Sequence, residues 1–154
     1  MTGVDIPALS AILLMMGLAG VAGTGVVSRL LGRQLYSVLG VIPLVMAGLA
    51  LALIVFGHNP VMVAALLVGW GFFGTAAPVG WGSWLARTMP EDAEAGGGLQ
   101  VAIIQFAITL GAASGGLLFD MVNWWAPFAL ASVLLTGAAV LAVAARPSVR
   151  KART

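Results

Sequence analysis

The sequence predicts an all-α integral membrane protein with about five transmembrane helices. Of the 154 residues, 61% are hydrophobic and 8% are charged, and the mean hydropathy is +1.09. The charged residues gather in a few clusters, and the apolar stretches between them exceed the roughly 20 residues that a helix needs to cross the hydrocarbon core. We expect spans at 6–28, 34–57, 60–86, 97–119 and 123–145 of a single transmembrane domain, 1–154.

The distribution of Lys and Arg predicts the orientation. All seven basic residues lie in the 29–33 loop, in the 87–96 loop or in the basic tail 146–154, which are connections on one side of the membrane. The positive-inside rule places this side in the cytoplasm of the plasma (inner) membrane. The N-terminus is then expected outside. Because the chain has no cleavable signal, we expect a preceding segment to be missing.

Composition narrows the classes of function. The sequence pI is about 10.0, but the basic residues flank the membrane, so we expect contacts with anionic lipid and no nucleic acid partner. There is no cysteine and only one histidine. No nucleophile, base and acid converge in any span, so we expect no enzyme, no cofactor and no metal site.

The first two spans differ in character. The first, 6–28, is rich in glycine, and closely spaced glycines let a second helix approach. We therefore expect it to pack against neighbours. The second, 34–57, contains Pro43 but little else that is polar, so we expect it to face lipid. His58 and Asn59 follow as an outer turn, since Asn-Pro is a turn signal.

An aromatic stripe marks the third span. Pro78 interrupts the helix, and glycines loosen the backbone around it. Helical spacing places the following residues on one face: Trp70, Phe73, Ala77, Trp81 and Trp84. Trp70 and Phe73 either stack on a planar ligand or pack against other helices, and Trp84 suits an interfacial aromatic belt.

The fourth span carries polar residues at membrane depth. Gln105 and Thr109 lie near its middle, and Gln100 lies nearer its start. Such residues either line a cavity that holds substrate or connect helices, with Gly111 and Gly115 as the contact. The fifth span is plainly apolar and opens with two tryptophans, which we expect at the outer interface.

Two stretches resemble the major facilitator superfamily of transporters. Residues 25–34, GVVSRLLGRQ, resemble a degraded copy of its G-x-x-x-D-R-x-G-R-[RK] loop motif. Residues 78–87, PVGWGSWLAR, followed by QVAIIQ at 100–105 and GAASGGLLFD at 111–120, resemble the tenth and eleventh helices of proton-coupled efflux permeases of the arabinose-efflux and purine ribonucleoside efflux type.

The resemblance implies a fold and a place within it. The family has twelve helices in two halves, and the five spans match helices eight to twelve, a partial half-bundle at the C-terminal end. The first, third and fourth spans would then line the central cavity, while the second and fifth pack outside. The missing N-terminal half, or other partner helices, would complete the assembly in the lipid bilayer.

The resemblance also implies proton-coupled efflux, by antiport, of a small polar organic solute such as a purine nucleoside or sugar. A planar base would suit Trp70 and Phe73, and sugar hydroxyls would suit Gln105 and Thr109, with Gln100 as a further binding residue. No acid lies at membrane depth, since Asp120 and the other acids sit at span edges. A small non-transporting membrane protein, or a truncated product that assembles with partner helices, remains the alternative.

Overall fold

The computed structural model of the chain describes residues 5–144, apart from the side chains of 31–34. These residues form four helices and no strand: α1 (Ile6–Phe56), α2 (Pro60–Thr88), α3 (Ala93–Met121) and α4 (Ala126–Ala144). Five segments of these helices are long and apolar enough to cross a membrane. The all-helical, five-span prediction is thereby confirmed, while the basic tail 146–154 lies outside the described residues.

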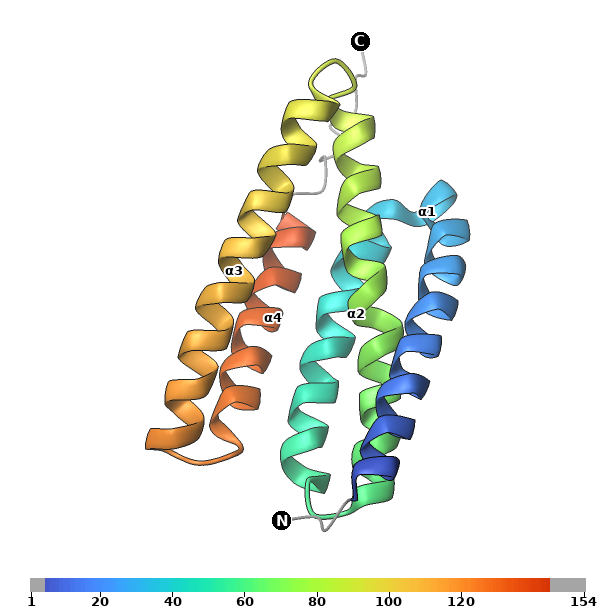
Figure 1. Ribbon diagram of the computed structural model, residues 1–154. Helices are drawn as coiled ribbons and strands as arrows, with labels where there is room; N and C mark the ends of the chain where they lie inside the picture. The colour runs from blue at the N-terminus through green and yellow to red at the C-terminus, as the bar shows by residue number, and fades with distance from the viewer. Residues whose placement is uncertain (1–4, 145–154) are drawn as a thin grey trace.

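Helix α1 holds two of these five segments. A straight helix of its 51 residues would extend about 75 Å, far beyond a hydrocarbon core of about 30 Å. Figure 1 shows that α1 instead turns back on itself. We call Ile6–Leu30 the first leg and Leu35–Phe56 the second leg. The sequence predicted these legs as separate spans, 6–28 and 34–57.

Successive spans run in opposite directions, which divides the molecule into two ends (Figure 1). The corner of α1 and the loop from α2 to α3 lie at the same end, and Arg29 and Arg87 flank them. We call this the basic end. The turn from α1 to α2 and the turn from α3 to α4 lie at the opposite end, near the start of α1.

Side-chain caps fix where two helices begin at this opposite end. An Asp5 carboxylate oxygen accepts a hydrogen bond from the Ala8 N–H at 3.1 Å, and Asn59 Oδ1 accepts from Val61 and Met62 N–H at 3.0 and 3.2 Å. Such caps satisfy amides that the first helical turn leaves unpaired. Proline occupies the first turn of both helices, where its missing N–H costs nothing.

The second leg of α1 forms the centre of the bundle. In its most apolar stretch 39% of residues are buried, compared with 11% in the first leg and in α2, 22% in α4 and none in α3. The prediction that 34–57 faces lipid is therefore wrong. The reason is that α2 and α4 both pack on α1, and small buried residues such as Gly40, Ala47 and Ala50 let them come close.

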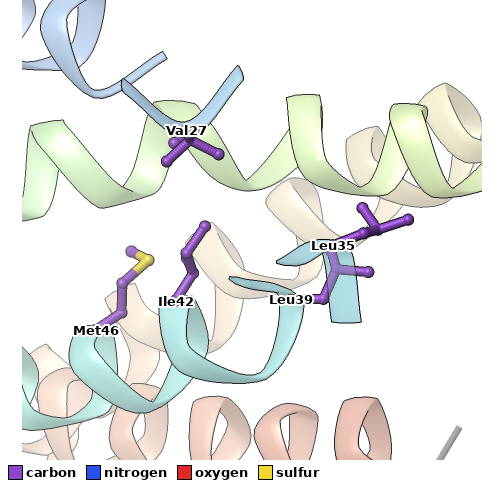
Figure 2. Packing of buried hydrophobic residues seen from close by; sticks show 6 residues of the cluster. Val27, Leu35, Leu39, Ile42 and Met46 are labelled. Atoms are coloured by element: carbon purple, nitrogen blue, oxygen red, sulfur yellow. The ribbon is translucent and has the colours of Figure 1, made fainter. Parts of the chain in front are cut away.

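A hydrophobic cluster near the basic end joins the two legs to α2. Figure 2 shows Val27 of the first leg pointing toward Ile42 and Met46 of the second. The cluster consists of Val27, Leu35, Leu39, Ile42, Met46 and Ala76. Leu135 of α4 packs against it from outside. The cluster therefore fixes the position of α2, which carries the aromatic stripe.

Glycines bring the first leg into close contact with α2. A Cβ atom on Gly23 would collide with the Phe72 carbonyl oxygen, and one on Gly71 would collide with the Met16 carbonyl oxygen. Nearby, the Thr75 hydroxyl donates to the Gly20 carbonyl oxygen at 3.0 Å, across the two helices. The predicted packing role of the glycine-rich span is confirmed.

Helix α3 stands apart from this bundle. None of its residues is buried, and it meets its neighbours near its two ends. At the basic end a Cβ on Gly96 would lie 3.0 Å from Leu85, and at the opposite end a Cβ on Gly115 would lie 3.9 Å from Pro127. Its middle is uncovered within the described residues, and this is where the candidate polar residues lie.

Candidate functional site

The middle of α3 presents two polar side chains that the described residues leave uncovered. Gln105 and Thr109 are both exposed. The Thr109 hydroxyl donates to the Gln105 backbone oxygen at 2.9 Å, so its hydrogen is used within the helix. The Gln105 amide has no hydrogen bond to any part of the described chain. An amide at membrane depth needs a partner, which a solute or another helix can provide.

Trp70 and Phe73 lie elsewhere. Both are half-buried and pack against the hydrophobic cluster between α2 and the two legs of α1. The rings of Phe72 and Phe73 meet edge to face, with centroids 5.0 Å apart. The structure thus does not bring Trp70 and Phe73 together with Gln105 and Thr109. Their predicted contact with a planar base stays a prediction, and their contacts here are those of packing residues.

The two tryptophans at the end of the aromatic stripe differ in their surroundings. Trp84 packs against the hydrophobic cluster, while Trp81 is 38% exposed. Their rings meet edge to face, with centroids 5.9 Å apart and planes at 75°. Beside them a pocket of about 380 Å³ opens between the last turns of α2 and the first turns of α3. Its lining comprises Trp81, Trp84, Leu85, Met89, Gly96, Leu99, Gln100, Ile103 and Ile104.

Gln100 is therefore a predicted site residue that lines this pocket, whereas Phe73 lines a smaller pocket of about 210 Å³ between the two legs of α1. Gln100 provides the only amide side chain in the lining of the larger pocket. The pairing of Gln100 with Trp81 was not predicted, although the sequence contains a signal for it. The two residues lie at similar distances from the short connection between α2 and α3, and a helical hairpin brings such positions side by side.

An aromatic contact that was not predicted from the sequence joins two turns at the opposite end. The rings of His58 and Trp124 meet edge to face, with centroids 5.7 Å apart and planes at 89°. A Cβ on Gly57 would lie 2.6 Å from the Trp124 ring, so the turn is pressed against that side chain. Trp124, expected only as an interfacial anchor, thus joins the two turns at this end.

No metal centre is evident in residues 5–144, because no three His, Cys, Asp or Glu side chains lie together there. The described acids and the histidine all lie at helix ends or in the connections between helices.

Several curated proteins are similar to the chain. Transcription regulatory protein OpdE of Pseudomonas aeruginosa is 49% identical over 142 residues, which cover 92% of this chain and 35% of that protein. Purine ribonucleoside efflux pump NepI of Salmonella paratyphi C is 38% identical over 144 residues, 94% of this chain and 36% of the pump. NepI of Salmonella enteritidis PT4 is 37% identical over the same shares.

The chain spans about a third of the length of the curated relatives that it matches, at 35% and 36%. No family model matches it, and no solved structure matches it. The names of these relatives point to an efflux transporter and a transcription regulatory protein. Together with the five apolar helices, the pump relatives indicate a multi-pass membrane protein.

Proposed function

We propose that this chain is the C-terminal portion of a major facilitator secondary transporter. The transporter exports a small polar organic solute, such as a purine ribonucleoside or a sugar, across the plasma (inner) membrane in exchange for protons. The similarity to purine ribonucleoside efflux pumps over 94% of the chain supports this assignment.

One observation carries the proposal: the amide of Gln105 has no hydrogen-bond partner in the described residues, on a helix without any buried residue. In a lone chain, α3 would expose this amide to lipid, where an unpaired polar group costs free energy. The helix is therefore suited to be covered by further helices on one side of a water-filled path. Gln105 and Thr109 then contact the solute along that path.

The coverage of the relatives supports a larger assembly, since roughly two thirds of their length has no counterpart here. An N-terminal half, or other partner helices, would cover α3 and supply the proton carrier. Such a carrier is an ionisable group within the membrane, and the middles of the five spans contain none.

The test is reconstitution of the missing part. The N-terminal two thirds of the Salmonella pump would be produced with this chain in proteoliposomes, and efflux of a labelled purine ribonucleoside driven by a pH gradient would be measured. We expect efflux only when both parts are present. In Gln105→Leu the efflux rate should fall about 10-fold, because the variant loses one hydrogen bond to the solute in a buried site. Efflux by residues 1–154 alone, or none from the combination, would refute the proposal.

A second candidate follows from the 49% identity to a protein named as a transcription regulatory protein. A non-transporting membrane protein that assembles with partner helices would also use the uncovered face of α3. The same reconstitution separates the two functions. A stable complex of the two parts without any efflux would favour assembly.

A further inference from the structure

We infer that the pocket between the ends of α2 and α3 captures the base of a purine ribonucleoside before the solute reaches the middle of α3. The inference rests on the proposed function for its choice of solute. It assigns a second binding position to the chain, nearer the basic end than the membrane-depth position proposed for Gln105.

The pocket has a suitable size, and its lining comes from two helices and the connection between them. Its volume of about 380 Å³ lies within the range of roughly 300–1,000 Å³ that small-molecule sites occupy. Every lining residue belongs to α2, to α3 or to the connection between them. The pocket can therefore be tested in residues 1–154.

Trp81 provides a stacking surface that is held in place. Its side chain is exposed to the pocket while Trp84, packed on the hydrophobic cluster, meets it edge to face at 5.9 Å. A ring supported from one side loses little freedom when a planar base stacks on its other face. Stacking of a base on an aromatic side chain contributes about 1–3 kcal/mol.

Gln100 is the one residue with a side-chain amide in this almost wholly apolar lining, and its amide would turn toward the base to bind it. Its side chain is half-buried, and no hydrogen bond joins it to the described residues. The amide offers both an acceptor and donors, and glutamine pairs through both with the N6 and N7 edge of adenine. Gln105 follows five residues later on α3, about 7.5 Å further along the helix axis. The two amides thus form successive steps from the basic end toward mid-span.

Acidic residues in the connection beside the pocket favour a nucleoside over a nucleotide. Glu91, Asp92 and Glu94 lie in or beside the connection between the lining residues Met89 and Gly96, and all three are exposed. Arg87 provides one opposing charge nearby. The excess of carboxylates repels a phosphate group, while carboxylates accept hydrogen bonds from ribose hydroxyls.

Equilibrium binding of labelled adenosine to residues 1–154 in lipid nanodiscs tests the pocket. We expect Trp81→Ala to weaken binding about 10-fold, Trp81→Phe to retain most of it, and Gln100→Leu to reduce the preference for adenosine over uridine by about 10-fold. Adenosine monophosphate should compete more weakly than adenosine. Trp125→Ala, which removes a 41% exposed tryptophan at the opposite end, should bind as the wild type does.

The inference is overturned if the wild-type chain binds no adenosine at millimolar concentration, or if Trp81→Ala binds as tightly as the wild type. Equal losses in Trp81→Ala and Trp125→Ala, with both proteins monodisperse and helical, would also overturn it. If the transporter proposal is wrong, the experiments give a different result. In the reconstituted efflux assay, wild-type binding without efflux rejects the transporter and leaves the pocket, whereas efflux that is unchanged in Trp81→Ala rejects the pocket alone.

Discussion

Gly23 shows how a single residue sets the distance between two helices. Its missing side chain lets the first leg of α1 lie directly against the Phe72 carbonyl of α2. We expect Gly23→Ala to force the helices apart and destabilise the protein by about 1–3 kcal/mol, as overpacking does in other cores. Gly25 is the matched control, because a Cβ there meets nothing within 4 Å.

Thermal unfolding in detergent, followed by circular dichroism, checks this pair of variants. Gly23→Ala should unfold at a clearly lower temperature than the wild type, and Gly25→Ala should not. Equal stability of the two variants would contradict the close contact between the first leg and α2.

The same glycines show what a sequence can predict at this scale. Four glycines in 6–28 predicted a packing role, and Gly20 and Gly23 have that role while Gly17 and Gly25 face open space. The spacing alone cannot identify the contacting face, because that depends on where α2 lies. Trp81 was similarly grouped with Trp70, although the approach of α3 places Trp81 beside a pocket.

At the scale of the elements, length and hydropathy were sufficient to predict five spans, because the bilayer requires each to be long and apolar. Burial was not predictable in the same way. Lipid tails are as apolar as Leu, so a span that faces lipid and one that faces protein have similar sequences. The second leg of α1 was therefore expected at the lipid face, yet it forms the centre.

Helix α3 is the element that the described chain leaves most exposed to lipid. Because none of its residues is buried, we expect an apolar photoactivated carbene reagent to label α3 of residues 1–154 in liposomes much more than the second leg. Mass spectrometry of the fragments measures this. Phe106, which is 66% exposed, provides a reporter position, and Ala76, which is fully buried, is its control.

Producing the N-terminal part of a longer relative together with this chain should then protect α3 while the labelling of α4 changes little. Labelling of α3 no greater than that of the second leg, in the chain alone, would show that its face is covered by other parts of the chain. That result would remove the main support for the transporter proposal.

At the scale of the whole molecule, the positions of the basic residues predict which way each span crosses the membrane. The structure places Arg29 and Arg87 at one end, together with the connection from α2 to α3. Positive residues are retained on the cytoplasmic side, so we expect the basic end and the Trp81 pocket to face the cytoplasm. An efflux substrate would then meet this pocket before it reaches Gln105.

Single cysteines test this orientation cleanly, since the chain has no cysteine of its own. Ala95→Cys reports the basic end, and Val122→Cys reports the turn between α3 and α4; both positions are exposed. In intact cells, a membrane-impermeant maleimide should label Val122→Cys at once and Ala95→Cys only after permeabilisation. The reverse pattern would place the pocket outside, where it would receive a solute at the end of export, so it could not be a capture site.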